Sequence, residues 1–269
     1  MRPLEELPHR FWPKDRLPEG VAPRDKFANQ KAADFKKAYT KVVNPRLKAA
    51  GFRCASTRAH RQGPSLWEGT WFLAGKYGGT GMLLIAAHPV GFPARNNFAM
   101  DPPPYDYARC VFMRPAEICP GHDMFDLGRD LEEGLETARL MVEAFEAHGV
   151  PYLAELATAR AQLLAVDAAN FDASLPAVHA RLGLRVTDSS FETVENSRPE
   201  LALLLARLHF EAGNMSAVRG LCELGRVATA VTYAQAKAPL TLFTTVFDRL
   251  ARGEGPLHPT AEENRAAWA

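Results

Sequence analysis

Apolar and polar positions follow a helical period between residues 30 and 51. Apolar side chains recur there every three or four residues, which predicts an amphipathic helix with its lysines mostly on the other side. The apolar face consists of Phe35, Ala38, Tyr39, Val42 and Leu47. Pro45 predicts a bend in this helix. Gly51 predicts its end, because glycine readily adopts the left-handed conformation that closes helices.

Four strands are predicted after this helix. They span about residues 52–60, 66–75, 80–88 and 107–114. The third strand is almost continuously apolar, which is typical of a central strand covered on both faces. Gly78 and Gly79 supply the residues that a tight hairpin turn before this strand requires. A long proline-rich loop is predicted over residues 89–104.

The second half of the chain has helical periodicity throughout. Asp130 can cap a helix whose apolar residues repeat at helical spacing, and residues 149–151 (Gly-Val-Pro) predict its end. Further helices are predicted at about 153–166, 173–183, 199–212, 215–229 and 232–252. Gly213 and Asn214 predict a turn between two of them, which makes a helical hairpin. The tail from Gly253 is predicted to be frayed.

The first 29 residues carry five prolines among polar and aromatic side chains. Because proline lacks an amide donor and fixes φ, residues 1–29 are predicted to form an extended arm, with Phe11 and Trp12 docking on the protein itself or on a neighbour. The predicted fold class is α+β. Residues 30–155 form a domain with a small antiparallel sheet of about four strands and helices on one face, and residues 156–269 form an all-helical domain.

Composition places the chain among soluble globular proteins, with 47% hydrophobic and 23% charged residues. No apolar run approaches the length of about 18 residues that crosses a bilayer, so no membrane partner is predicted. The N-terminal residues are acidic and proline-rich where a secretion signal would be basic and then apolar. Four cysteines without framework spacing are typical of reduced thiols, which predicts a cytoplasmic location.

Charge is distributed unevenly along the chain. Residues 1–61 hold 15 Lys and Arg against 6 Asp and Glu, whereas the remainder holds 17 against 25. The densest run consists of Lys31, Lys36, Lys37, Lys41, Arg46, Lys48, Arg53, Arg58 and Arg61. Two interpretations stay open: a solvated helix face, or a phosphate-binding patch with sheet aromatics as stacking platforms. Strand alternation puts Trp67 and Trp71 on one face and Phe72 on the other, so at least one set belongs to the core.

One glycine-rich segment and one cysteine-containing segment are candidates for cofactor and metal binding. Residues 75–81 resemble a phosphate loop, but the lysine precedes the glycines and a strand follows, which favours a hairpin turn. The nearest approach to a metal cluster is Cys110, Cys119, His122, Asp123 and Asp126. Its spacing does not match structural zinc sites, and Cys110 fits a core position. No cofactor and no metal are therefore predicted.

Strand ends offer a second candidate for anion binding. If the strands share one sheet, Arg58, His60, Lys76 and His88 border one edge and form an anion-binding rim. Solvated strand ends explain the same residues equally well. No nucleophile motif appears, since a reactive serine or cysteine needs a base and an orienting group within reach.

A family resemblance rests on several short segments. They are Leu47-Lys48 followed by Gly51-Phe52, the strand hairpin, residues 110–114 (Cys-Val-Phe-Met-Arg) and residues 149–152 (Gly-Val-Pro-Tyr). In this order they resemble an uncharacterised bacterial domain-of-unknown-function family (DUF4304-like) over roughly residues 30–160. The resemblance implies an α+β fold with helices on one face of an antiparallel sheet. It implies no activity and no catalytic residues.

Three functional hypotheses follow. The first is a non-catalytic bacterial binding protein that contacts a protein partner, or itself, through its helical half and the acidic helix at 130–146. The second is nucleic-acid binding through Lys36, Lys37, Lys41 and Arg46. The third is a hydrolase or transferase at the sheet–helix junction, which requires a pocket with His60 or His88 beside a carboxylate.

Overall fold

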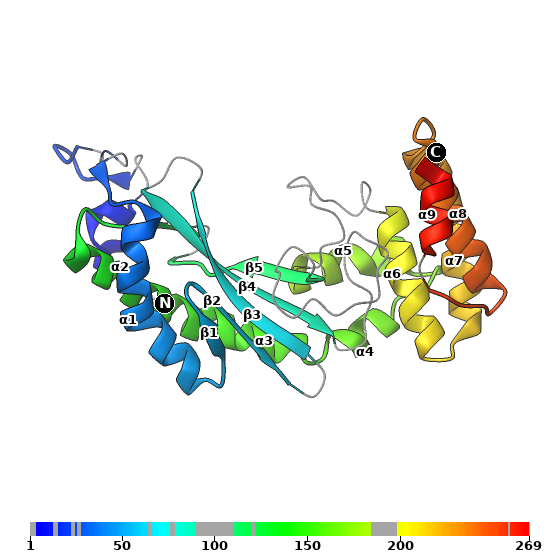
Figure 1. The fold of residues 1–269 in the computed structure, drawn as a ribbon, viewed down its shortest axis with the longest axis horizontal. Helices are drawn as coiled ribbons and strands as arrows, with labels where there is room; N and C mark the ends of the chain where they lie inside the picture. Colours follow the sequence, from blue (N-terminus) through cyan, green and yellow to red (C-terminus); the bar gives the residue numbers. More distant parts are fainter. Residues whose placement is uncertain are drawn as a thin grey trace. The chain divides into compact units, whose positions relative to one another are not determined.

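A computed structural model gives the fold in two compact units (Figure 1). It describes residues 4–12, 16–22, 25, 28–63, 66–75, 79–89, 110–119, 122–183, 198–257 and 259–268. The first unit comprises Met1–Ala87 and Met113–Ala154, and the second comprises His88–Phe112 and Glu155–Ala269. Among the described helices, none combines the length and the apolar character needed to cross a membrane.

The predicted α+β class is confirmed, and the sheet has more strands than predicted. Its described strands are β1 (Arg53–Ala55), β2 (Arg58–Gln62), β3 (Leu66–Ala74), β4 (Thr80–Pro89), β5 (Phe112–Pro115) and β6 (Met124–Asp126). They run in the order β1-β2-β3-β4-β5, with β6 paired to β4. The prediction of about four strands is slightly wrong, because a turn at Ser56 (φ 61°) splits the first predicted strand into β1 and β2. β6 is only three residues long, too short for a period to show.

The two faces of the sheet carry different residues. Arg58 lies opposite Trp71 and His60 opposite Gly69, so these four share one face, and Ala59 points to the other. Helix α1 (Ala32–Ala49) covers that second face: the Phe72 ring lies 5.2 Å from the ring of Phe35. Helix α2 (Leu131–Ala144) packs beside α1.

Two glycines let aromatic rings lie flat on the sheet. A Cβ on Gly69 would lie 2.1 Å from the Trp71 ring, and one on Gly81 would lie 2.2 Å from the Phe72 ring. Any larger residue would therefore displace a ring. The Trp71 side chain is only 4% exposed as a result of this packing.

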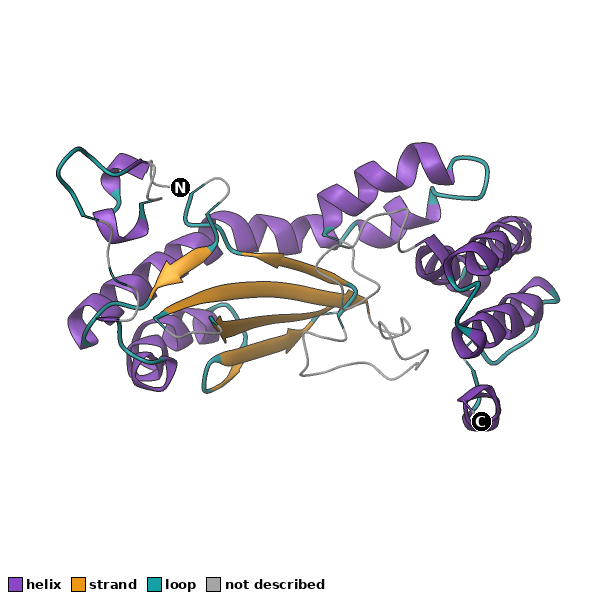
Figure 2. Ribbon diagram, turned by 90° about the horizontal axis from the view of Figure 1, so that it is seen from above, coloured by secondary structure: helices purple, strands orange, loops and turns teal. Residues whose placement is uncertain are grey.

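The helix that begins with α2 does not end at residues 149–151, so that prediction is wrong. It passes through a π-helical turn, η6 (Phe145–Gly149), into α3 (Val150–Leu156), and Figure 2 shows this continuous helix beside the sheet. In a regular helix the Pro151 ring would clash with the carbonyl of Ala147, and the wider π turn relieves that clash. The helix start is as predicted, because the Asp130 side chain accepts a hydrogen bond from the Glu133 amide at 3.0 Å.

The N-terminal arm packs within the first unit. It contains two 3-10 turns, η1 (Leu4–Glu6) and η2 (His9–Phe11). Leu7 and Phe11 are 4% and 1% exposed. Arg10 forms an ion pair with Glu136 of α2 at 2.6 Å. Arg10 also forms an ion pair with Asp126 of β6 at 3.9 Å, so apolar anchors and two ion pairs hold the arm in the first unit.

The second unit is mainly helical. Its described helices after α3 are α4 (Ala159–Leu164), α5 (Phe171–Leu182), α6 (Arg198–Glu211), α7 (Met215–Thr232), α8 (Lys237–Ala251) and α9 (Ala261–Trp268). The predicted hairpin turn is present: Gly213 has φ 75° and the Asn214 side chain caps α7. The predicted frayed tail is wrong. Thr260 and Glu263 cap the start of α9 reciprocally, and Glu263 forms an ion pair with the buried Arg249.

Candidate nucleic-acid interface

Helix α1 carries most of the cations that were predicted to bind an anionic partner. Phe35 and Tyr39 anchor one side of α1 in the core. Lys37, Lys41 and Lys48 are four and seven residues apart, so they fall on one stripe along the helix. The exposed cations of α1 are Lys36, Lys37, Lys41, Arg46 and Lys48. All four α1 residues named in the nucleic-acid hypothesis are therefore accessible to solvent.

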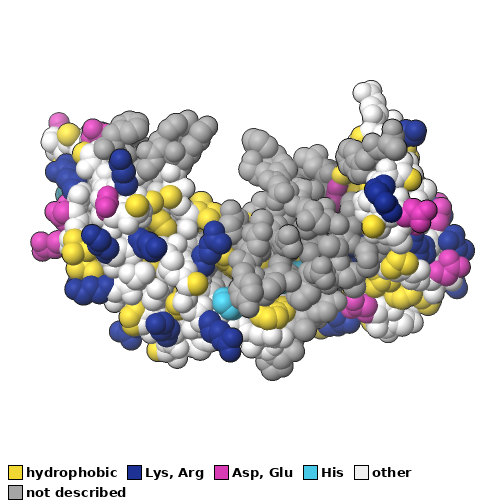
Figure 3. Space-filling view, viewed as in Figure 1, with side chains coloured by type: hydrophobic (Ala, Val, Ile, Leu, Met, Phe, Trp, Pro, Cys, Tyr) yellow, Lys and Arg dark blue, Asp and Glu magenta, His cyan; other side chains and the backbone are white. Residues whose placement is uncertain are grey.

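Two arginines of the neighbouring strands extend this set. Arg53 in β1 and Arg58 in β2 are both exposed. The basic surface is defined here as Lys36, Lys37, Lys41, Arg46, Lys48, Arg53 and Arg58. Figure 3 shows Lys and Arg side chains gathered over α1 and over β1 and β2. Lys48 and Arg53 belong to the basic run named in the sequence analysis, and the structure places both on this exposed surface.

The cations of the basic surface are not neutralised by the rest of the described chain. None of the seven side chains forms an ion pair or a hydrogen bond with another described residue. Seven uncompensated charges of one sign on one unit create a positive potential that attracts polyanions. Helix α1 packs beside the acidic helix α2, and Lys37 lines a shallow pocket with Asp34 and Asp130, but no described carboxylate forms an ion pair with this surface.

Arg61 belongs to the same basic run in the sequence but has a structural role. Its guanidinium forms an ion pair with Glu68 and donates a hydrogen bond to the Ala50 carbonyl at 2.5 Å. It also lies 4.6 Å from the centre of the Phe52 ring. These contacts close the C-terminal end of α1, and a cation there is favoured by the helix dipole. Arg61 is therefore excluded from the basic surface.

His60 lies beside the basic surface without adding charge to it. In the strand register His60 is opposite Arg53, so both side chains project from the same face. Burial lowers the pKa of His60, and the positive charge of Arg53 lowers this pKa further. The ordinary value is 6.5, so His60 is neutral at pH 7.

The anion-binding rim predicted at the strand ends is only partly assembled. Arg58 and His60 share one face of β2. His88 is fully buried in β4, so it does not contribute to an exposed rim. Lys76 lies outside the described residues. The rim therefore reduces to Arg58 and His60, and Arg53 of the basic run lies beside them.

The sheet aromatics divide between core and surface. Phe72 packs against Phe35 and Tyr39, with ring centres 5.2 and 5.9 Å apart. Trp71 is buried over Gly69, whereas Trp67 remains half-buried. Of these three predicted stacking platforms, only Trp67 retains a solvent-accessible side chain.

Cysteine and metal chemistry find little support in the described part of the chain. No group of three or more His, Cys, Asp or Glu side chains there could hold a metal ion. Cys110 and Cys119 are buried and lie outside any disulfide. Burial raises the pKa of Cys119, so this thiol is less reactive than an exposed one.

Comparison of the chain with family models, with curated proteins and with solved structures found no match. The resemblance to a bacterial domain of unknown function therefore stays a prediction. The basic surface is interpreted from its own geometry and charge.

Proposed function

We propose that the protein is a non-catalytic binding protein and that its basic surface binds the phosphate backbone of nucleic acid. The observation that carries the proposal is the set of seven exposed cations that have no ion-pair partner among the described residues. Phosphate neutralisation by such side chains releases counterions and provides most of the affinity in non-specific nucleic-acid binding.

The extent of the basic surface favours a polymer over a small anion. Helix α1 has 18 residues and is therefore about 27 Å long. Its exposed cations are distributed from Lys36 to Lys48, so they extend along most of this length. A single phosphate contacts one or two side chains, whereas a nucleic-acid backbone presents a charge at every nucleotide. The spacing thus fits a polyanion laid along the helix.

The mode of binding should be independent of base sequence. Trp71 and Phe72 are used in packing, which leaves Trp67 as the stacking platform of the described sheet. Contacts to phosphates fix the position of a nucleic acid but read no sequence. We therefore expect similar affinity for unrelated sequences and a strong dependence on salt.

The test is a fluorescence-anisotropy titration with a labelled duplex and a labelled single strand, both of about 20 nucleotides. Replacing Lys37, Lys41 and Lys48 with glutamine should reduce the slope of log affinity against log salt by about 3, since each phosphate contact contributes about 0.9. These residues are exposed, so the fold should be retained.

The matched control carries the same kind of change on the second unit. Arg219 and Lys237 are exposed there, and neither pairs with a described residue. Replacing both with glutamine should alter affinity by less than about twofold. The proposal would be disproved if the control variant lowered the affinity for nucleic acid equally, or if that affinity did not change with salt concentration.

The hydrolase or transferase alternative gains nothing from the described residues. His88 is fully buried, and His60 lies opposite an arginine. Enzymatic activity stays an untested alternative, and bacterial origin and cytoplasmic location stay predictions.

A further inference from the structure

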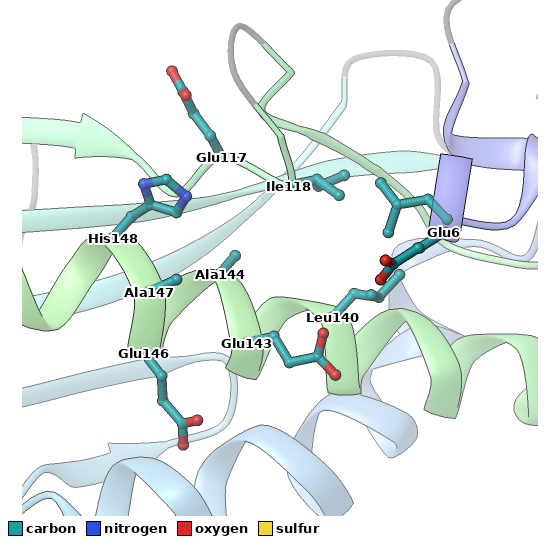
Figure 4. Close-up of a pocket in the computed structure, with 10 residues that line it drawn as sticks. Glu6, Glu117, Ile118, Leu140, Glu143, Ala144, Glu146, Ala147 and His148 are labelled. Carbon is teal, nitrogen blue, oxygen red and sulfur yellow. The ribbon is translucent and has the colours of Figure 1, made fainter. Parts of the chain in front are cut away.

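The first unit contains a groove with an apolar floor, distinct from the basic surface. Its volume is about 590 Å³, and the arm, the loop after β5 and α2 enclose it (Figure 4). Four apolar side chains of its floor are each 4% or 5% exposed: Leu7, Ile118, Leu140 and Ala144. The size is within the range of about 300–1,000 Å³ that is typical of ligand-binding clefts.

The rim of the groove is acidic. It is formed by Glu6, Glu117, Glu143 and His148, and the described residues that line the groove include no Lys or Arg. Figure 4 shows the Glu6 and Glu143 side chains near Leu140 and shows Glu146 pointing away from the cavity. Glu117 and Glu143 also have partners within the chain. The choice of ligand is therefore based on the negative charge of the lining as a whole and not on an unpaired carboxylate.

One wall of the groove has a fixed backbone. It is the π turn η6, which carries Ala147 and His148. Gly149 at its end packs closely on the sheet, since a Cβ there would lie 2.6 Å from Cδ1 of Ile85. The Phe145 ring packs edge-to-face on Phe52 at 5.9 Å. π turns are rare and often occur at functional sites, and this one holds its groove residues in place.

We propose that the groove docks a short segment of a partner protein in which an apolar side chain is flanked by lysine or arginine. The apolar floor accepts the central side chain, and the carboxylates of the rim complement the flanking cations. The proposal goes beyond nucleic-acid binding and is independent of it, because no lining residue belongs to the basic surface.

Other occupants fit the groove less well. The carboxylates repel the phosphates of a nucleic acid. A small polyamine would match the charge but leave the floor uncovered. The chemistry of both floor and rim is satisfied only by a ligand that is apolar and basic at once.

The test uses a fluorescein-labelled peptide of alternating leucine and lysine, titrated with the full chain at moderate salt. Two control peptides replace leucine by serine or lysine by glutamate. We expect saturable one-to-one binding of the first peptide alone. Absence of saturable binding up to about 1 mM would overturn the proposal. So would equal binding of the serine peptide, because charge alone would then explain the attraction.

Variants of the rim and wall localise the binding. The double change Glu6→Gln and Glu143→Gln should lower the affinity for the peptide by about tenfold. Ala147→Trp fills the groove from an exposed helix position and should abolish binding. Glu146→Gln is the matched control, since its carboxylate points away from the cavity, and it should change affinity by less than about twofold.

Three further outcomes would refute the proposal. If Glu146→Gln weakens peptide binding as much as the rim variant, the peptide is held by non-specific charge attraction and not by the groove. If Ala147→Trp has no effect, the peptide binds elsewhere. If sedimentation shows self-association of the chain that the rim variant abolishes, the occupant is a second copy. The lysine variants of α1 are not expected to affect the peptide, so failure here is distinguishable from failure of nucleic-acid binding.

Discussion

Arg61 and Lys41 are both cations of one basic run, yet they have opposite roles. Arg61 joins Glu68, the end of α1 and the Phe52 ring. Lys41 is exposed and has no described partner. Their contribution to stability and to binding should differ accordingly.

We predict that Arg61→Ala lowers the free energy of unfolding by about 1 kcal/mol, because a charged hydrogen bond to a helix end and a ring contact are lost. Lys41→Ala should change it by less than about 0.5 kcal/mol, since the side chain is exposed and forms no ion pair with a described residue. Urea denaturation followed by circular dichroism measures both. A Lys41 variant as unstable as the Arg61 variant would contradict this assignment.

His60 makes stability depend on pH. Its pKa is lowered by burial and by Arg53, so the unfolded chain takes up the proton before the folded chain as pH falls. The folded state is therefore penalised below the ordinary value of 6.5, and the penalty is absent well above it. We predict that His60→Gln loses less stability than the wild type between about pH 7.5 and about pH 5.5. Identical losses in urea denaturation would show that His60 does not contribute.

At the scale of single elements, local chemistry predicted some boundaries and missed others. The Asp130 cap and the Gly213 turn depend on residues within one turn of the boundary, so the sequence reveals them. Thr260 and Glu263 form a capping box whose residues are also local, although the proline- and glycine-containing tail around them favoured a frayed end. The π turn depends on the packing of Gly149 against Ile85, which are distant in sequence.

The candidate surfaces follow the same rule. Exposure of Lys36, Lys37 and Lys41 was predictable from helical period alone. Separating Arg61 from them required Glu68 and Ala50 as partners, and these contacts arise only in the folded sheet. The acidic groove joins three segments of the chain, so no local pattern indicates it.

Gly149→Ala should destabilise the protein by about 1–3 kcal/mol, although alanine favours helices, because its Cβ would overlap Ile85 and Phe145. Ile85→Val removes the Cδ1 atom of that overlap. The double variant should therefore be more stable than the sum of the two single effects predicts. Strict additivity in urea denaturation would show that the π turn adjusts without strain.

Thr260→Ala should destabilise α9 by about 1 kcal/mol, because the capping hydrogen bond to the Glu263 amide is lost. Amide hydrogen exchange within residues 261–268 measures this change directly. Thr241→Ala, at an exposed position of α8, is the control and should leave that exchange unaltered. Equal exchange in both variants would mean that the cap contributes nothing.

At the scale of the whole molecule, opposite charges are concentrated on separate surfaces. The basic surface and the acidic groove both belong to the first unit, but they share no residue. A protein with two such surfaces can hold a nucleic acid and a basic partner together. The uneven charge along the sequence pointed toward this arrangement without locating the groove.

If both proposals hold, the two ligands should bind simultaneously. A saturating amount of the leucine–lysine peptide should change the affinity for the labelled duplex by less than about threefold, since separate sites couple weakly. Anisotropy of the duplex, with and without unlabelled peptide, measures the coupling. If the peptide displaced the duplex, the two ligands would compete for the same surface.

The ring of Trp71 over Gly69 has a practical consequence for spectroscopy. Trp12, Trp67 and Trp71 lie in the first unit, and Trp268 is the remaining tryptophan of the chain. A Trp268→Phe variant would therefore emit tryptophan fluorescence from the first unit alone. The buried Trp71 should emit at shorter wavelength than the half-buried Trp67, and the emission should shift when the sheet opens. Intrinsic tryptophan fluorescence would thus report on the unfolding of the unit that carries both proposed surfaces.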